Sequence, residues 1–358
     1  MTPREHVLTV LQRRPAGQIP FTMYEAFITP RASEREMRNR GMCIVDRRER
    51  PFKAHRPNVN VKSVTERVRG KIMTRTYFET PVGTVSELNE PAGFTSWHHE
   101  KFFKSPDDYK VLEFILKDEV FQADYGPLNE AMKRDGGDSI FRAQVGLEPL
   151  QTFISGRMMK MEDFCIQWME NRDEILKLYR IVAEKHRELY PILAESPVKI
   201  INYGGNVVSE IIGEDVYRQY YLPHYREAAD YFRKHGKMTG CHLDSNNKLI
   251  ARAVAESGLD YIEAFTPSPD TDMTLAEART EWPDMILWLN FPSSVHLKTD
   301  EEVRNHTVNL LNELDSAEGV IMGITENIPE NRGYDSCLAI MDGLEQHHRD
   351  FPGMYPAG

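Results

Sequence analysis

The stretch Lys237-Met-Thr-Gly-Cys-His-Leu-Asp244 is an apolar run that ends in a histidine and an aspartate. About eighty residues later, the run Gly319-Val-Ile-Met-Gly-Ile-Thr-Glu326 ends in a glutamate. Alternate residues of a strand point to the same side, so His242 and Asp244 can converge on one point. If the two strands end side by side, Glu326 completes a set of one nitrogen and two oxygen ligands, the usual form of a catalytic metal site. The alternative is a surface His and Asp at a strand-to-helix turn, with Asp244 or the serine after it capping the next helix.

Around these two runs, the second half of the chain alternates strands with helices. The expected strands are rich in apolar residues and cover Val198–Tyr203, Met238–Leu243, Tyr261–Phe265, Met285–Asn290 and Val320–Thr325. The expected helices between and after them are amphipathic, and two open with capping-box patterns at Thr274 and Thr299. Near-continuous apolar strands separated by amphipathic helices predict a parallel sheet covered on both faces. No GxGxxG motif follows the first strands, so a closed (β/α)8 TIM barrel is favoured over a dinucleotide fold.

The first half fits the same scheme with a long interruption. Ile19–Glu25 and Ser139–Val145 are predicted as two further barrel strands. The stretch between them, approximately residues 26–138, is too long for one crossover and is predicted as an insertion containing a β-hairpin within Val64–Thr76 and a turn at Pro81–Gly83. Seven barrel strands are placed and the eighth is not. Residues 1–358 are predicted to form a single barrel domain, a size that α/β barrels reach.

Composition limits the possible environments and partners. The formal net charge of -11 argues against non-specific nucleic-acid binding. No apolar run approaches the roughly 20 residues of a membrane span, and the N-terminus lacks the apolar region of a signal peptide. The four cysteines are scattered without a CxxC pair, so neither a disulfide framework nor a thiolate zinc cluster is indicated. These features predict a cytoplasmic protein with reduced thiols that binds neither nucleic acid nor membrane.

Polar residues cluster at the predicted carboxyl ends of the strands, the end at which barrel active sites lie. They are Tyr24 and Glu25, Asn202 and Tyr203, His242 and Asp244, Glu263, Asn290, and Thr325 with Glu326. Several carboxylates around one imidazole would repel each other unless they shared a cation. A nitrogen and oxygen set without thiolate favours zinc, iron or manganese. For each residue alone, the alternative is a satisfied polar group at the start of a loop.

Several segments resemble the uroporphyrinogen decarboxylase superfamily, specifically its corrinoid-dependent methyltransferase branch. The segments Thr80-Pro-Val-Gly-Thr84 and Lys104-Ser-Pro-Asp-Asp-Tyr109 look like that family's TPxGT and following acidic motifs. Glu214 to Pro223 looks like its helix before the metal strand, and Gly240-Cys-His-Leu-Asp244 stands in the place of its H-x-C. Glu326-Asn-Ile-Pro-Glu-Asn331 stands where the family has its later cysteine. The likeness covers nearly the whole chain and rests on the order and spacing of these pieces.

The departures from the family pattern narrow the expected function. Decarboxylases of the family carry an arginine motif near the first strand that grips the tetrapyrrole carboxylates, whereas Met23-Tyr-Glu-Ala-Phe27 has no arginine. Decarboxylation of uroporphyrinogen is therefore disfavoured. Asp244 and Glu326 replace two cysteine ligands of the thiol-methylating members. Carboxylates leave the metal more Lewis acidity than thiolates do, which suits it to polarise an oxygen.

The resemblance therefore implies an O-demethylating methyltransferase. One zinc ion held by His242, Asp244 and Glu326 would help to move a methyl group from a methoxylated, preferably aromatic, substrate to the Co(I) of a corrinoid on a separate protein. The residues expected to orient or protonate the leaving oxygen are Tyr203, Asn290 and Glu263. The residues expected to bind the substrate are Tyr24, Glu25, Phe27, Trp97 and Phe265. Two alternatives stay open: a metal-dependent hydrolase or lyase, and a non-catalytic protein that binds a corrinoid or tetrapyrrole.

Overall fold

A computed structural model describes residues 1–92 and 95–355 of the chain. They form two compact units. The first, here called the barrel unit, comprises Met1–Pro51, Tyr125–Gln144 and Ala194–Gly358, as far as these residues are described. The second, the insert unit, comprises Phe52–Asp124 and Val145–Leu193. The predicted insertion at 26–138 therefore overlaps both units, and the prediction of one domain over residues 1–358 stays a prediction.

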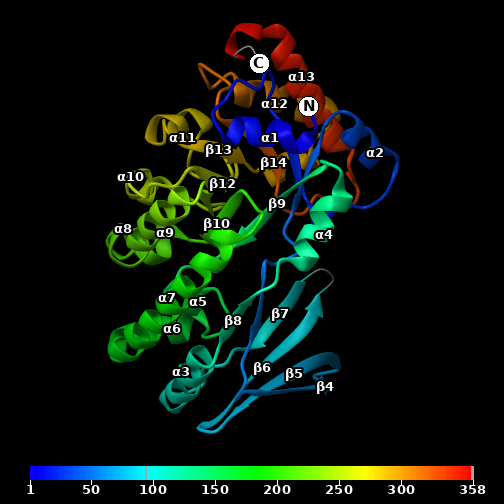
Figure 1. The fold of residues 1–358 in the computed structure, drawn as a ribbon. Coiled ribbons are helices and arrows are strands. Elements are labelled where there is room, and N and C mark those ends of the chain that lie inside the picture. Colours follow the sequence, from blue (N-terminus) through cyan, green and yellow to red (C-terminus); the bar gives the residue numbers. More distant parts are fainter. Residues whose placement is uncertain (93–94, 356–358) are drawn as a thin grey trace. The chain divides into compact units, whose positions relative to one another are not determined.

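The barrel unit contains a closed parallel barrel, which confirms the predicted (β/α)8 architecture (Figure 1). Around the barrel the order is β1-β14-β13-β12-β11-β10-β9-β2. The strands are β1 Phe21–Tyr24, β2 Cys43–Asp46, β9 Ser139–Gln144, β10 Ile200–Gly205, β11 Met238–His242, β12 Tyr261–Phe265, β13 Ile286–Leu289 and β14 Val320–Ile324. The strand that the sequence left unplaced is β2, a four-residue segment inside the stretch predicted as insertion.

Side chains at every second position of the strands fill the barrel interior, as the period of two requires. The lower part is apolar and includes Val45, Ile200 and Trp288, with Val7 and Val10 packed against it. These last two belong to α1, Pro3–Leu11, whose first turn is closed by a Thr2–Glu5 capping box. Gly240 makes room in this core, because a Cβ at that position would lie 2.1 Å from the ring of Tyr261. This apolar core fills the part of the barrel beneath the polar residues of the candidate site, which are described in the next subsection.

Helices follow most of the barrel strands. They are α2 Ala32–Asn39, α4 Gly126–Asp135, α8 Ser209–Tyr220, α9 Leu222–Lys234, α10 Ala251–Ala255, α11 Leu275–Glu281, α12 Asp300–Leu311 and α13 Asp335–Asp350. The capping boxes expected at Thr274 and Thr299 are present at the starts of α11 and α12. Short 3-10 turns occupy the loops above the strands: η1 Glu25–Phe27, η3 Lys248–Ile250, η4 Ser293–Leu297 and, near the C-terminus, η5 Pro352–Met354.

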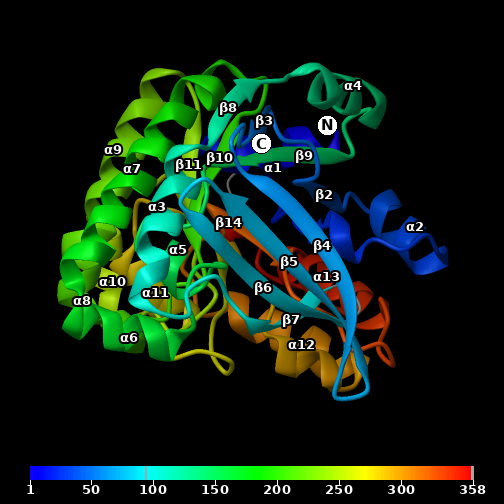
Figure 2. The same cartoon turned by 90° about the horizontal axis from the view of Figure 1, so that it is seen from below.

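The insert unit has two antiparallel sheets and a group of helices. One sheet has the order β4-β5-β6-β7, with β4 Asn60–Val68, β5 Lys71–Thr80, β6 Gly83–Ala92 and β7 Thr95–Glu100 side by side (Figure 2). The predicted hairpin is β4–β5, and the predicted Pro81–Gly83 turn joins β5 to β6. The other sheet pairs β3 Phe52–His55 with β8 Val120–Ala123. The helical segments are η2 Pro106–Asp108, α3 Tyr109–Lys117, α5 Gln151–Ile154, α6 Met161–Glu170 and α7 Arg172–Glu195.

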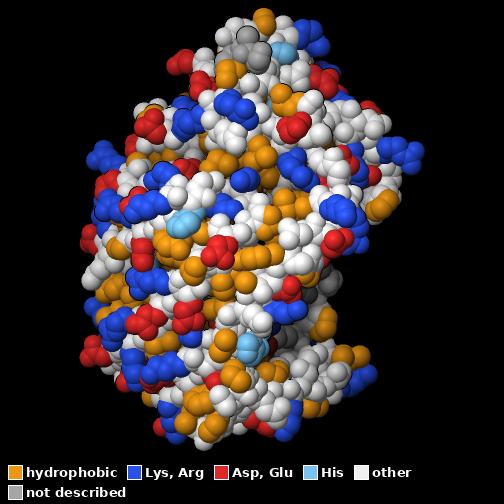
Figure 3. Space-filling model, viewed as in Figure 1, with side chains coloured by type: hydrophobic (Ala, Val, Ile, Leu, Met, Phe, Trp, Pro, Cys, Tyr) orange, Lys and Arg blue, Asp and Glu red, His pale blue; other side chains and the backbone are white. Residues whose placement is uncertain are grey.

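Charged side chains of both signs share the surface (Figure 3). On the face drawn in Figure 3, lysines and arginines are intermixed with aspartates and glutamates. Among the helices of the described residues, none is long and apolar enough to cross a membrane.

Candidate active site

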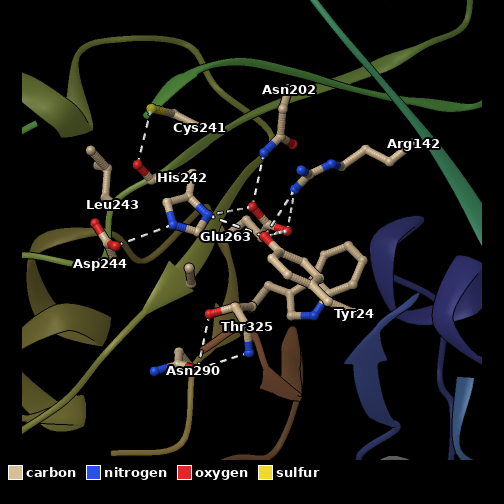
Figure 4. A network of polar contacts seen from close by, with 12 residues as sticks. Tyr24, Arg142, Asn202, Cys241, His242, Leu243, Asp244, Glu263, Asn290 and Thr325 are labelled. Carbon is tan, nitrogen blue, oxygen red and sulfur yellow. Dashed lines mark hydrogen bonds and ion pairs between the residues drawn. The ribbon is translucent and has the colours of Figure 1, made fainter. Parts of the chain in front are cut away.

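A buried carboxylate, Glu263 of β12, is the centre of a polar network at the upper part of the barrel (Figure 4). Its Oε1 accepts a hydrogen bond from the hydroxyl of Tyr24 (2.6 Å), and its Oε2 accepts one from Nδ2 of Asn202 (2.9 Å). The guanidinium of Arg142 forms an ion pair with the same carboxylate. Four different strands, β1, β9, β10 and β12, therefore supply one network whose charges compensate each other inside the barrel.

His242 connects this network to the barrel mouth. Its Nδ1 lies 3.0 Å from Oε2 of Glu263 and 3.2 Å from the hydroxyl of Tyr24. Its Nε2 lies 3.3 Å from Oδ2 of Asp244, the more exposed of its two carboxylate partners. The imidazole is thus held between two carboxylates, with Asp244 on one side of the ring and Glu263 on the other (Figure 4).

The surroundings control the charge states of these groups. Burial by itself would lower the pKa of His242, but the hydrogen bonds and charges of Asp244 and Glu263 outweigh it and raise that pKa to about 9. Burial would raise the pKa of Glu263, but Arg142 and His242 hold it well below the usual range. Burial, reinforced by the charge of Glu263, raises the pKa of Tyr24. At neutral pH, and without a bound metal, the network contains an imidazolium at His242, a guanidinium at Arg142 and a carboxylate at Glu263.

Tyr24 is held on its other side by an arginine that follows β2. The guanidinium of Arg47 lies 3.4 Å from the centre of the Tyr24 ring and makes two hydrogen bonds with Glu25, at 2.9 and 3.1 Å. The ring of Phe27 stacks against that of Tyr24 at 6.3 Å. Glu25, predicted to bind substrate, therefore already has a cationic partner. Arg47, which the sequence places in a run of charges, is part of the site's wall.

Asn290 and Glu326 lie above β13 and β14. The side-chain oxygen of Asn290 accepts hydrogen bonds from the backbone N–H and the hydroxyl of Thr325, both at 2.9 Å. Asn290 thus ties the two strand ends together. The carboxylate of Glu326 accepts a hydrogen bond from the hydroxyl of Ser293 (2.6 Å). Glu326 is therefore engaged with the loop after β13, while Glu263 is the second carboxylate at His242.

Three predicted site residues lie in other surroundings. Tyr203 is buried with its ring against Tyr225 of α9 at 6.0 Å, and its neighbour Asn202 is the residue of β10 that contacts Glu263. Phe265 is buried against Trp282 at 5.5 Å, at the end of α11. Both rings therefore belong to the packing between strands and helices. Trp97 is on β7 of the insert unit with 66% of its surface exposed.

Zinc fits part of this arrangement. Two ligands of one tetrahedral zinc ion stand ~3.3 Å apart, given metal–ligand distances of about 2.0 Å. Nε2 of His242 and Oδ2 of Asp244 have this separation. A carboxylate on the other imidazole nitrogen, as Glu263 provides, is the usual support of a zinc-binding histidine. However, the described residues include no group of three His, Cys, Asp or Glu arranged to hold a metal ion. The structure therefore brings together two of the three predicted ligands, His242 and Asp244. The carboxylate of the third, Glu326, binds the hydroxyl of Ser293.

Sequence reasoning missed Arg142 and gave Asn202 no role. The signal for Arg142 is a single charged residue inside the otherwise uncharged strand Ser139–Gln144. A charged residue is almost never fully buried unless it is paired, so this arginine required a buried acid. Asn202 stands beside Tyr203 at a strand end, and choosing between neighbours required knowing which of them faces the barrel interior.

Comparisons with solved structures found weak likenesses. The chain is similar to a methyltransferase from Methanosarcina mazei, with 11% identity and a TM-score of 0.49, over 71% of this chain and 72% of that one. It is also similar to the IOLI protein with a bound zinc atom, with 12% identity and a TM-score of 0.35, over 66% of this chain and 84% of that one. Likenesses this weak carry no argument about function. No curated protein sequence matches the chain.

A family model gives the stronger result. The uroporphyrinogen decarboxylase (URO-D) model matches residues 152–344. This range includes Asn202, His242, Asp244 and Glu263, and it covers more than half of the 358 residues. The family expected from the sequence motifs is confirmed: the chain belongs to the uroporphyrinogen decarboxylase family.

Proposed function

We propose that this protein is an enzyme that moves a methyl group from a methoxylated, preferably aromatic, substrate to the Co(I) of a corrinoid carried by a separate protein. The observation that carries the proposal is the position of His242 between Asp244 and Glu263 at the barrel mouth. In this position one imidazole nitrogen contacts Asp244 on the more exposed side, where a substrate would bind, while the other nitrogen is held by the buried carboxylate of Glu263. Family membership supports the barrel scaffold, and the chemistry is argued from these residues.

The proposed reaction requires stabilisation of the negative charge that develops on the leaving oxygen. The methyl group would pass to the corrinoid of the partner protein, the O–CH3 bond would break, and its electron pair would stay on the oxygen as a phenolate or alkoxide. A group that neutralises this oxygen lowers the barrier, because the charge develops only as the bond breaks. A positioned proton donor contributes roughly 10²–10⁴-fold to such a step. In the metal-free chain His242, with its pKa raised to about 9, carries a proton near neutral pH that it can donate to this oxygen. With zinc bound, the metal would take the place of that proton as the group that neutralises the oxygen.

The other residues position His242. Glu263 holds Nδ1, and Tyr24, Asn202 and Arg142 hold Glu263. The three contacts that hold Glu263 are buried and the contact of His242 with it is partly buried, so the imidazole is oriented before the substrate arrives and little reorganisation remains for the reaction itself. The stacked rings of Tyr24 and Phe27 provide an aromatic wall beside it.

We further propose that His242, Asp244 and Glu326 hold a zinc ion. When bound, zinc would supply a Lewis acid that lowers the effective pKa of the leaving oxygen. In that state Glu263 would keep its position on Nδ1 of His242 and strengthen the imidazole as a ligand. Since Glu326 binds the hydroxyl of Ser293, it would have to exchange this partner for the metal.

Decarboxylation of a tetrapyrrole is less well supported. Such a substrate carries several carboxylates, which require free cations. Met23–Phe27 has no arginine, but two arginines from other segments line the site. Each is paired within it: Arg142 with Glu263 and Arg47 with Glu25. Their charge is therefore used to stabilise the network.

The test uses the complete chain with a corrinoid protein reduced to Co(I) and a set of methoxylated benzenes. We expect the absorption spectrum to change from Co(I) to methyl-Co(III) only when chain and substrate are both present. His242→Ala should abolish the change, whereas the exposed His235→Ala should not. Bound metal is measured in the same preparations, together with Asp244→Ala and Glu326→Ala, and should fall in these two and in His242→Ala.

The outcomes separate the alternatives. Substrate turnover without any corrinoid protein would favour a metal-dependent hydrolase or lyase. Tight corrinoid binding without methyl transfer, and unchanged by the three substitutions, would favour a non-catalytic corrinoid- or tetrapyrrole-binding protein. Full metal occupancy in all three variants would show that these residues are not the zinc ligands. An unchanged rate of methyl transfer in His242→Ala would overturn the proposed role of His242.

A further inference from the structure

Strand β4 is an edge strand of the insert unit's four-stranded sheet. It runs over nine residues, Asn60–Val68, and pairs along its whole length with β5 on one side. Of the strands in residues 1–92 and 95–355, none pairs with its other side. Most of its residues are exposed, including Val61 and Val64, each with 51% of its surface accessible. A long exposed edge of this kind is a template for another strand.

We propose that the occupant is β4 of a second copy of this chain, paired antiparallel about a two-fold axis at Val64. The two four-stranded sheets then become one continuous sheet of eight strands. This inference concerns a surface of the insert unit and is independent of the reaction proposed for the barrel unit.

The sequence of β4 favours one register. With Val64 opposite its own copy, all nine residues find partners, and Lys62 stands opposite Glu66 of the second copy, twice by symmetry. Opposite charges in directly facing positions stabilise a strand pair. Moving the register by one residue in one direction places Lys62 opposite Arg67, and in the other direction places Lys62 opposite Thr65. The symmetric register is the one of these three that matches the charges.

The neighbouring strand extends this match. Within one chain, Lys62 binds Glu79 of β5 (2.7 Å) and Glu66 binds Arg75 of β5 (3.0 Å), which also binds Glu100 of β7 (2.7 Å). Joining two copies places Lys62 of one beside Glu66 of the other. The result is a row of alternating charges, Glu79, Lys62, then Glu66, Arg75 and Glu100 of the second copy. Two such rows flank the central pair of Val64 residues on the same face of the sheet.

The contact between the two β4 strands is small, so the dimer is expected to be weak. Two nine-residue strands bury less than the ~1,200 Å² typical of a stable interface. We therefore expect a reversible dimer, and a covalent trap is the suitable probe. In the symmetric register the two Cβ atoms at position 64 are ~5 Å apart, near the range of a disulfide. The two Cβ atoms at position 61 are six residues apart along the strand, ~20 Å.

The experiment compares Val64→Cys with Val61→Cys in the full chain, both in a Cys165→Ser background because Cys165 is the exposed cysteine among the described residues. The two valines have the same exposure, so chance collisions would oxidise both variants alike. We expect Val64→Cys to shift under mild oxidation to twice the mass of the chain and Val61→Cys to stay at the single mass. Circular dichroism confirms that both variants are folded.

A charge exchange tests the register. In the Val64→Cys background, Lys62→Glu should reduce cross-linking, and Lys62→Glu with Glu66→Lys should restore it. The double variant keeps both new repulsions within the chain, against Glu79 and Arg75, so restoration can come only from the contact between copies. Equal cross-linking of the Val61 and Val64 variants, or no cross-linking of the Val64 variant, would overturn the dimer. Failure of the double variant to recover would overturn the register.

Discussion

The barrel network and the insert sheet both contain ion pairs between arginine and glutamate, but those of the barrel are buried and those of the sheet are partly exposed to solvent. Arg142 binds Glu263 where both side chains are almost inaccessible to water. Arg75 binds Glu66 and Glu100 on the surface of a sheet, with part of each side chain in solvent. In the barrel, each charge has lost its hydration and depends on its partners. On the sheet, water can replace a lost partner.

Because of this difference in burial, we expect the charges of the two regions to have different roles. The barrel network is interdependent, because removing one member leaves another charge buried without compensation. Such a network holds His242 in one orientation. The charges of the sheet are replaceable one by one, and they contribute to recognition between surfaces more than to stability. The following substitutions test this contrast, in decreasing order of expected effect.

Removing the buried arginine should have the largest effect. Arg142→Met leaves the carboxylate of Glu263 buried beside a neutral side chain, and we expect the free energy of unfolding to fall by about 3–5 kcal/mol in urea titrations. The double variant Arg142→Met/Glu263→Leu should lose less than the sum of its single variants, because the uncompensated charge is gone. Additive losses would contradict the idea of an interdependent network.

The pH dependence of stability should reveal His242. In the chelator-treated chain, the pKa of His242 is about 9 folded, against an ordinary value of 6.5. A raised folded pKa gives stability that is complete below 6.5 and is lost as the pH rises through about 9. The loss should reach about 3 kcal/mol by pH 10, since each pKa unit corresponds to ~1.4 kcal/mol. His242→Gln should remove this slope, and so should saturation with zinc if His242 is a ligand. A slope unchanged in His242→Gln would assign it to another group.

Removing one hydroxyl from the network should have a smaller effect. Tyr24→Phe deletes the donor to Oε1 of Glu263 but keeps the ring that packs on Phe27 and Arg47. A lost hydrogen bond to a charged group costs about 1.5–3 kcal/mol. We expect unfolding free energies to fall in that range, together with a lower rate of methyl transfer, because Glu263 would hold His242 less firmly. Unchanged stability and rate would mean that the hydroxyl has no part in positioning.

The exposed counterpart of Arg142→Met should change least. Arg75→Met removes the same charge by the same substitution from the insert sheet, where two carboxylates lose a partner at the surface. We expect a loss of under about 1 kcal/mol. Raising the salt concentration to about 1 M should narrow it further, since exposed charges are screened within ~3 Å at that ionic strength. A loss as large as that of Arg142→Met would show that the two networks do not differ in the way described.

Much of the fold was predictable because it depends on local patterns. The seven predicted barrel strands, the capping boxes at Thr274 and Thr299 and the hairpin of the insert all follow from residue periodicity and turn chemistry over a few neighbours. The strand β2 was missed because four residues, Cys43–Asp46, give too short a pattern to separate from a loop. The site was less predictable, because it is assembled from residues as far as 239 positions apart in the sequence.

The sequence by itself determined the barrel class, the family and the pairing of His242 with Asp244, since these depend on patterns within short segments. Only the tertiary structure decided which residues meet across the barrel. It turned Asn202 inward and Tyr203 outward, and it placed Glu263 at His242 while Glu326 binds Ser293. The physical reason is that a strand's period of two is local, whereas the side that faces the interior is set by burial. The partner of a buried charge is likewise set by the barrel's closure, which brings Arg142 to Glu263.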